Sequence, residues 1–228
     1  MGQVCSRYFL DADGNVIAYT FRVPVDERIR RRFNIAPSQE APVIRATREG
    51  GGREVAMLRW GLVPFWAKDP SVGSRMINAR SETVSEKPAF REAMRSRRCA
   101  VPASGFYEWT GEPRRRVPHA ITVEERPVVA FAGLWERWKD REGRPLETYT
   151  ILTTPANRFV GAMHDRMPAI LAEDDVEAWL AGSPEQARKA IRPYPDEAMR
   201  ERVVSRAIND PRNESGRMPE ADGDPMRP

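Results

Sequence analysis

Four short segments of the sequence carry side chains that could do chemistry. They are residues 5–7 (Cys-Ser-Arg), 78–80 (Asn-Ala-Arg), 105–109 (Gly-Phe-Tyr-Glu-Trp) and 164–168 (His-Asp-Arg-Met-Pro). Each sets a polar or charged residue among apolar or small ones. A thiol, a carboxylate and an imidazole are capable of nucleophilic and acid–base chemistry. Glu108 is the most informative, because an acid within an aromatic strand costs free energy unless it is paired or used.

Taken singly, each of these residues also has an ordinary structural interpretation. Cys5 could be a terminal residue without a role, and Asn78 could cap a turn. Glu108 could pair with an arginine, and His164 could be a structural histidine. The second cysteine, Cys99, stands at the start of a strand and is expected in the core. Only the joint occurrence of the four segments favours a functional site.

The length and composition are those of one ordinary domain. The 228 residues are 40% hydrophobic, enough for a core, and the sequence has no apolar run long enough to cross a membrane. No signal peptide is visible, so we expect a cytoplasmic protein, with a monomer as the default state. The two cysteines and two histidines are not spaced as a metal motif, so neither a metal nor another cofactor is expected.

The net charge of +4 at pH 7 is carried mostly by arginine. A planar guanidinium donates hydrogen bonds in pairs and therefore suits phosphate recognition. A codon bias in a GC-rich genome would give the same composition. The charge is thus compatible with nucleic-acid binding but does not by itself indicate it.

Local patterns predict more strands than helices. Residues 16–23 are rich in β-branched and aromatic side chains and are expected to form a strand, whereas 25–32 are expected to form a short charged helix. Residues 41–47 and 53–60 are expected to pair as a hairpin. Further strands are expected at 99–101, 106–110, 119–123, 128–135 and 148–153.

Helices are expected at 86–95, at 173–180 and at 184–191, with another starting at Thr154 and Pro155. The order of elements shows no βαβ alternation and no phosphate-binding glycine motif. It predicts an α+β fold: a single domain, residues 1–213, built on a curved, mostly antiparallel β-sheet with peripheral helices. The polar stretch 214–228 is expected to be a disordered tail.

Seven short motifs, in this order along the chain, resemble those of the SOS-response-associated peptidase (SRAP) family. One such motif would be weak support, but seven in the right order, between residues 5 and 213, are strong support. They are Cys5-Ser-Arg-Tyr8, Asn34-Ile-Ala-Pro37, Trp60-Gly-Leu-Val-Pro-Phe-Trp66, Ile77-Asn-Ala-Arg-Ser-Glu-Thr83, Gly105-Phe-Tyr-Glu-Trp109, His164-Asp-Arg-Met-Pro168 and Val204-Ser-Arg-Ala-Ile208.

The resemblance implies a role in the DNA damage response: capture of abasic sites in single-stranded DNA through Cys5. The amine and thiol of an N-terminal cysteine would close a thiazolidine with the aldehyde of the opened deoxyribose. Asn78 would hold the Cys5 end and the sugar, Glu108 would move protons, and His164 would act as acid or base during ring opening. An abasic-site lyase activity is implied as a further outcome.

The resemblance also implies how DNA is held. Arg7, Arg80 and Arg166 would bind phosphates on either side of the lesion, and Trp66 would stack on or wedge against a base. The implied partner is therefore single-stranded DNA that contains an abasic site.

The start of the chain departs from the family pattern. In the family the cysteine follows the initiator methionine directly, whereas Met1-Gly-Gln-Val4 precedes Cys5 here. A nitrogen in a peptide bond cannot form an imine, so the chemistry requires translation from Val4 or self-cleavage before Cys5; we favour the start at Val4. Two lesser departures are Ser6 in place of glycine and Ala67 where some members have a second tryptophan.

Two other functions stay open at the level of sequence. The first is a cysteine-type (auto)peptidase that uses Cys5 with His164 and Glu108. The second is a single-stranded DNA-binding module without chemistry. The need for a free amine at Cys5 distinguishes crosslinking from both alternatives. Crosslinking needs the amine and the thiol, a peptidase needs only the thiol, and a binding module needs neither.

Overall fold

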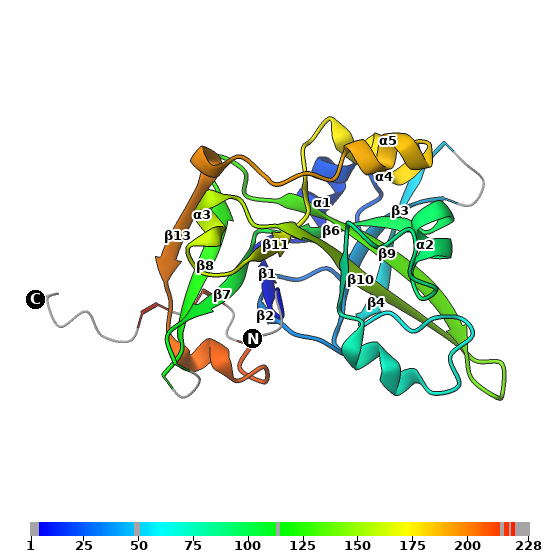
Figure 1. Cartoon of the computed structure of the whole chain (residues 1–228), viewed down its shortest axis with the longest axis horizontal. Helices are drawn as coiled ribbons and strands as arrows, with labels where there is room; N and C mark the ends of the chain where they lie inside the picture. Colours follow the sequence, from blue (N-terminus) through cyan, green and yellow to red (C-terminus); the bar gives the residue numbers. More distant parts are fainter. Residues whose placement is uncertain (1–4, 48–50, 113–114, 215–216, 219, 222–228) are drawn as a thin grey trace, which may run out of the picture.

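Two β-sheets, which lie side by side, form the framework of the molecule (Figure 1). The computed structural model describes residues 5–47, 51–112, 115–214, 217–218 and 220–221. Strands β7, β8 and β13 lie on one side in Figure 1, and the longer strands β9 and β10 lie on the other. Within these ranges, no helix is long and apolar enough to cross a membrane.

The larger sheet closes on itself into a small barrel. Strand β10 pairs antiparallel with β9 and parallel with β4, and the pairs β4–β3, β3–β6 and β6–β9 complete the ring. Strands β5 and β11 pair with the far end of β10, and β12 pairs with β9. The strands are β3 (Glu40–Ala46), β4 (Arg53–Trp60), β5 (Asn78–Arg80), β6 (Arg98–Ala103), β9 (Val129–Lys139), β10 (Pro145–Pro155), β11 (Arg166–Pro168) and β12 (Ile170–Leu171).

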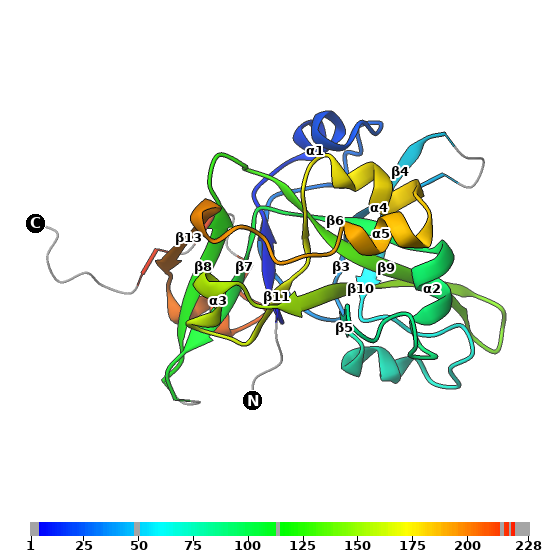
Figure 2. The same cartoon turned by 45° about the horizontal axis from the view of Figure 1, so that its top comes forward.

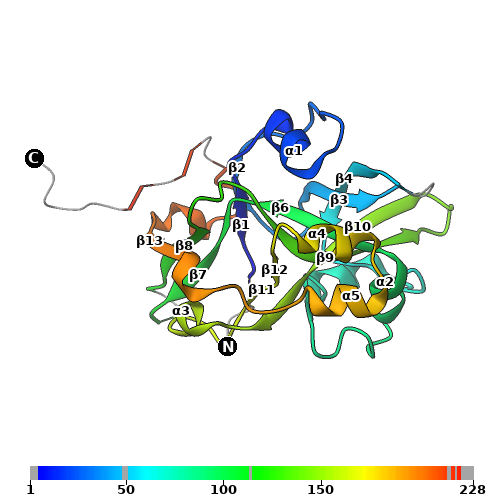
Figure 3. The same ribbon diagram turned by 90° about the horizontal axis from the view of Figure 1, so that it is seen from above.

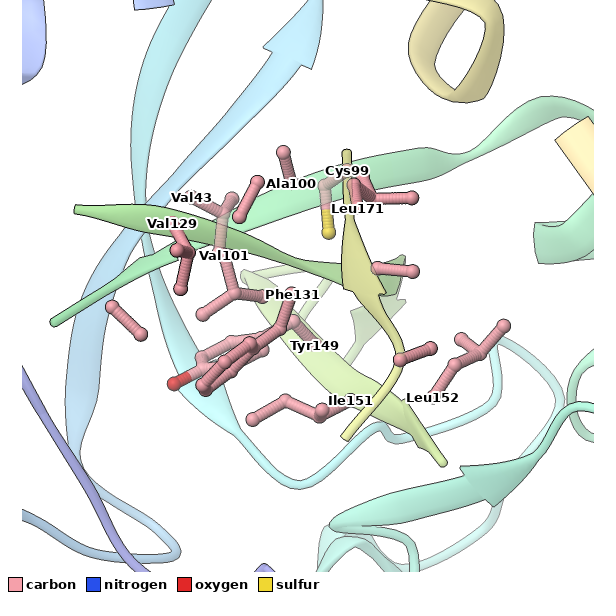
Figure 4. Packing of buried hydrophobic residues seen from close by; sticks show 14 of the residues in the cluster. Val43, Cys99, Ala100, Val101, Val129, Phe131, Tyr149, Ile151, Leu152 and Leu171 are labelled. Atoms are coloured by element: carbon pink, nitrogen blue, oxygen red, sulfur yellow. The ribbon is translucent and has the colours of Figure 1, made fainter. Parts of the chain in front are cut away.

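The barrel is filled by apolar side chains from these strands (Figure 4). In β4 the side chains of Ala56, Leu58 and Trp60 are buried and their neighbours are only partly so, which is the alternation of a strand with one face toward a core. Strand β6 is buried along its whole length. The side chains labelled in Figure 4 are Val43, Cys99, Ala100, Val101, Val129, Phe131, Tyr149, Ile151, Leu152 and Leu171.

The smaller sheet is antiparallel and has the order β13-β8-β7-β1-β2. One of its faces covers a second apolar cluster that includes Phe9, Phe33, Tyr107 and Ile208. Gly105 begins β7, and a side chain there would lie 2.3 Å from the Ile121 carbonyl oxygen, so β1 and β8 approach β7 closely. The strands are β1 (Tyr8–Leu10), β2 (Arg32–Ile35), β7 (Gly105–Thr110), β8 (Val117–Val123) and β13 (Met199–Val203).

Short helices surround the sheets (Figures 2 and 3). Helices α4 and α5 pack against each other above the barrel, and Ser183 and Gln186 form a capping box at the start of α5. The α-helices are α1 (Gly14–Phe21), α2 (Arg91–Ser96), α3 (Arg158–Gly161), α4 (Asp175–Ala181) and α5 (Pro184–Lys189), and the 3-10 helices are η1 (Pro70–Arg75), η2 (Asp196–Ala198) and η3 (Arg206–Asn209).

The first two local predictions are wrong. Residues 16–23, expected to form a strand, lie mostly in helix α1, because the Asp13 side chain accepts hydrogen bonds from the N–H groups of Asn15 and Val16 and caps a helix. The Ile17 and Phe21 side chains, one helical turn apart, are buried. Residues 25–32, expected to be helical, form a turn and extended chain that leads into β2.

Two further expectations about helices need correction. Thr154 and Pro155 do not start a helix; they are the end of β10, where they pair with β11. The helix begins at Arg158 instead, after Asn157, whose side chain accepts from the Val160 N–H. A helix was expected at 86–95, but the structure has turns in the first part of this range, and the helix α2 begins only at Arg91.

The other elements that the sequence predicts are present in the structure. The hairpin β3–β4, the strands β6 to β10 and the helices α4 and α5 are confirmed within a few residues at their ends. The α+β class with mostly antiparallel pairing is confirmed. Most of the expected tail at 214–228 lies outside the described residues, but Glu214 is described and forms an ion pair with Arg32.

Candidate functional site

Cys5 lies just before β1, in the middle of the candidate site. Its backbone has φ 43°, in the left-handed region, and its side chain is fully buried. Its N–H donates a hydrogen bond of 3.0 Å to Glu108 Oε1. Burial raises the pKa of the Cys5 thiol well above its ordinary value, and the charge of Glu108 raises it further.

Glu108 reaches Cys5 because β7 pairs with β1. Tyr8 lies opposite Phe106, and the Tyr107 N–H donates to the Arg7 carbonyl oxygen, so the two strands run together up to the start of β1. Glu108 is 4% exposed. Burial raises its pKa above the ordinary value of 4.5, while the Cys5 N–H and the positive charge of His164 act in the opposite direction.

Asn78 approaches Cys5 from the barrel side. Strand β5 pairs with β10 at Ile151, which holds Asn78 at the edge of the larger sheet. Its Nδ2 donates a hydrogen bond of 3.4 Å to the Cys5 carbonyl oxygen. Cys5 is therefore held at its N–H by one sheet and at its C=O by the other.

His164 lies between α3 and β11. Its Nδ1 is 3.1 Å from the Arg166 N–H, a donor, and 2.8 Å from Asp165 Oδ1, an acceptor. The first contact favours an unprotonated Nδ1 and the second a protonated one, so the ring has a partner in either state. A positive charge on its ring would lower the pKa of Glu108.

The four residues expected to interact with DNA have different environments. Trp66 and Arg80 are exposed. The Arg7 guanidinium instead donates to Asn34 Oδ1 at 2.6 Å and to a main-chain oxygen of η3 at 2.9 Å. The Arg166 guanidinium binds both carboxylate oxygens of Glu82 at 2.9 Å. The phosphate contacts of all three arginines stay predictions.

Two polar residues, Asn34 and Glu82, hold arginines of the site, although the sequence motifs that contain them gave them no role. Asn34 is fully buried and binds Arg7 as well as carbonyl groups of the C-terminal segment. Glu82 lies four residues after Asn78 and holds Arg166. An asparagine within the Asn-Ile-Ala-Pro motif and an acid within a polar motif were the available signals, but neither reveals its partner.

Fold and site together define an α+β protein that holds a cysteine between a buried glutamate and an asparagine. Among the described residues, no cluster of His, Cys, Asp and Glu has the arrangement of a metal site. The family model described as SOS response associated peptidase (SRAP) matches residues 4–211. The chain belongs to this family.

Relatives cover nearly the whole chain. It is 42% identical over 194 residues to the abasic site processing protein YoaM of Bacillus subtilis, an alignment that covers 83% of this chain and 85% of YoaM. It is 38% identical over 219 residues to YoqW of the same organism, also named an abasic site processing protein, covering 93% and 97%. A crystal structure of a Bacteroides thetaiotaomicron protein superposes with a TM-score of 0.82 at 29% identity, covering 91% of this chain and 97% of that one.

Proposed function

We propose that this chain processes abasic sites in single-stranded DNA by forming a covalent thiazolidine crosslink through Cys5. The names of the relatives support the abasic site as the substrate. The observation that carries the proposal is the 3.0 Å hydrogen bond between the Cys5 nitrogen and Glu108 Oε1. It puts a proton acceptor on the atom that must become the nucleophile.

The proposed reaction has two bond-forming steps. The free amine of Cys5 adds to the C1′ aldehyde of the opened deoxyribose, and loss of one water gives an imine. The thiol then adds to the imine carbon, and the thiol proton passes to the nitrogen, which closes a five-membered ring. The α-amine has an ordinary pKa near 8, so a useful fraction is neutral at physiological pH.

Glu108 suits the proton transfers of the first step. Its burial raises its pKa, so the carboxyl group exchanges protons closer to neutral pH than an exposed glutamate does. It would take a proton from the amine during addition and return one to the hydroxyl group of the adduct, which leaves as water. Asn78 would hold the Cys5 carbonyl in place, and His164 would serve as acid or base while the sugar opens.

The state of the thiol favours the crosslink over a peptidase. A cysteine peptidase attacks with a thiolate, and such thiols have lowered pKa values. The pKa of the Cys5 thiol is raised instead, so the thiol carries its proton at neutral pH. In the crosslink the thiol adds after the imine has formed, and it can give up its proton to the imine nitrogen as the ring closes.

DNA would reach the site along exposed side chains. Arg80 follows Asn78 in the same strand, and Trp66 presents an indole to solvent. A phosphate contact at Arg80 and base stacking at Trp66 would place the lesion beside Cys5. Single-stranded DNA suits such a site, because its bases are free to stack on a protein side chain.

The first experiment tests whether crosslinking requires Cys5 at the N-terminus of the chain. Three proteins would be mixed with single-stranded DNA that holds one abasic site: a chain that begins Met-Cys5, the full chain, and the first chain with Cys5→Ala. Each would be run on a denaturing gel, with the termini checked by intact mass. We expect a shifted band for the first protein and none for the variant.

Each outcome has a meaning. A band for the full chain together with a mass that lacks residues 1–4 would support self-cleavage. A band that persists with Cys5→Ala would defeat the assignment of the nucleophile. No band with any protein, while native gels still show binding, would favour a DNA-binding module. Cleaved DNA on the same gel would report the proposed lyase activity.

A further inference from the structure

The ion pair between Glu82 and Arg166 ties together two segments of the candidate site. The carboxylate of Glu82 accepts two hydrogen bonds of 2.9 Å, one from each terminal nitrogen of Arg166. This two-pronged geometry is the strongest form of a surface ion pair. Arg166 lowers the pKa of Glu82, so the pair is charged at neutral pH.

Arg166 is also fixed to the strand that separates the two segments. Its Nε donates to Thr153 Oγ1 at 3.1 Å, and Nη2 donates to the Thr153 carbonyl oxygen at 2.6 Å. With Glu82 on the other edge, the guanidinium makes four hydrogen bonds, and the Arg166 side chain is 12% exposed. These contacts hold the Arg166 side chain in one position across the end of β10.

The segments on either side carry functional residues. On one side β5 pairs with β10, and Asn78, four residues before Glu82, contacts Cys5. On the other side β11 pairs with β10, and the N–H of Arg166 donates to His164 Nδ1 at 3.1 Å. The same arginine thus contacts His164 through its main chain and the Asn78 segment through its side chain.

We propose that Glu82 is a positioning residue, which acts through Arg166 to hold His164 and Asn78 in register around Cys5. The inference rests on the proposed function and adds a residue and a role to it. The ion pair and the two contacts of Arg166 with Thr153 form the arrangement that we call the brace.

The two roles of Arg166 predict opposite effects of Glu82→Gln. If Arg166 is a phosphate ligand, removing the opposing carboxylate charge frees it, and DNA binding strengthens or stays constant while crosslinking continues. If the pair is a brace, the affinity changes little, whereas the covalent step slows at saturating DNA. Displacements near 1 Å slow reactions by up to about a hundredfold, so we expect a loss of about tenfold or more.

The experiment measures affinity and rate separately. Wild type, Glu82→Gln and Glu82→Asp, which keeps the carboxylate charge, are prepared as the full chain and with Cys5 following the initiator methionine. Affinity is measured with single-stranded DNA carrying a tetrahydrofuran analogue, which has no aldehyde, and the crosslinking rate with saturating abasic DNA. Glu185→Gln, at an exposed ion pair of α5, is the matched control.

We expect Glu82→Gln to lose rate at constant affinity, Glu82→Asp to keep more of the rate than Glu82→Gln, and the control to match wild type. An unchanged rate with Glu82→Gln overturns the inference. Stronger DNA binding with a steeper salt dependence and an unchanged rate also overturns it, because the freed Arg166 would then act on a phosphate.

A second measurement keeps the test independent of crosslinking. The chain has two histidines, His119 and His164, so their ring signals can be assigned by NMR with one variant each. In Glu82→Gln without DNA, the His164 resonances should move and those of His119 should not. Failure of the wild type to crosslink would contradict the proposed function. Unmoved His164 resonances would overturn the brace, whatever the crosslinking result.

Discussion

The N–H of Cys5 and the carboxylate of Glu108 form a 3.0 Å hydrogen bond between residues that are 103 positions apart. The bond exists because β1 adds to the edge of β7, which brings the start of the chain onto a buried acid. Burial of Glu108 makes its charge costly. If Glu108 moves protons as proposed, the reaction depends on a residue whose charge destabilises the fold.

Glu108→Gln is expected to stabilise the fold at alkaline pH while slowing the crosslink. A group with a raised pKa stabilises the fold below its unfolded pKa and loses that contribution as pH rises through the folded value. Gln keeps an acceptor for Cys5 and has no charge to bury. The melting temperature of the variant should exceed that of wild type at about pH 8, and the gap should close toward about pH 4.

The crosslinking rate of that variant should fall by roughly a hundredfold or more, the usual contribution of a positioned acid or base. Glu112→Gln, at an exposed position after β7, serves as the control and should change neither quantity. A Glu108→Gln variant that crosslinks at the wild-type rate would contradict the role given to Glu108.

We expect Cys5 to be required for crosslinking and Cys99 to contribute only to stability. Cys99→Ala is expected to retain crosslinking and to lose about 1 kcal/mol of stability, because its sulfur packs in the barrel beside Gly133. Cys5→Ala is expected to lose crosslinking completely. Denaturing gels and urea unfolding of both variants check this, and loss of crosslinking in a folded Cys99→Ala protein would contradict it.

Trp66→Ala should weaken DNA binding without changing the fold. The side chain is 54% exposed, so little packing is lost, and stacking with a base contributes about 1–3 kcal/mol. Affinity for single-stranded DNA, measured by fluorescence anisotropy, should fall accordingly. Tyr19→Ala, an aromatic on α1 that is 90% exposed, is the control; an equal loss there would point to nonspecific stacking.

Asn34→Ala should destabilise the protein by about 1–3 kcal/mol and loosen the C-terminal segment. The Asn34 amide accepts from Arg7 at 2.6 Å and donates to the carbonyl oxygens of Asp210 and Asn213 at 2.8 and 3.0 Å. Urea unfolding and hydrogen exchange of residues 204–214 measure the two effects. Asn15 is an exposed asparagine of α1, so Asn15→Ala should change neither quantity. Equal losses of stability in the two variants would contradict a stabilising role for the hydrogen bonds of Asn34.

Much of the fold could be predicted from short-range patterns. The alternation in β4 and the capping box at Ser183 depend on residues within one strand or one turn, so sequence suffices for them. Residues 16–23 show the limit, because β-branched side chains favoured a strand while the Asp13 cap and burial of Ile17 and Phe21 favour a helix. Packing overrides a weak local propensity.

The sequence by itself determined the family, through seven motifs, and which side chains could do chemistry, because these properties belong to residue types and their order. Only the tertiary structure decided that Glu108 binds the nitrogen of Cys5 and that Glu82 takes up Arg166. Such partners are set by strand pairing between distant segments, here β1 with β7 and β10 with both β5 and β11. No local pattern encodes that pairing, because its energy comes from packing the whole sheet.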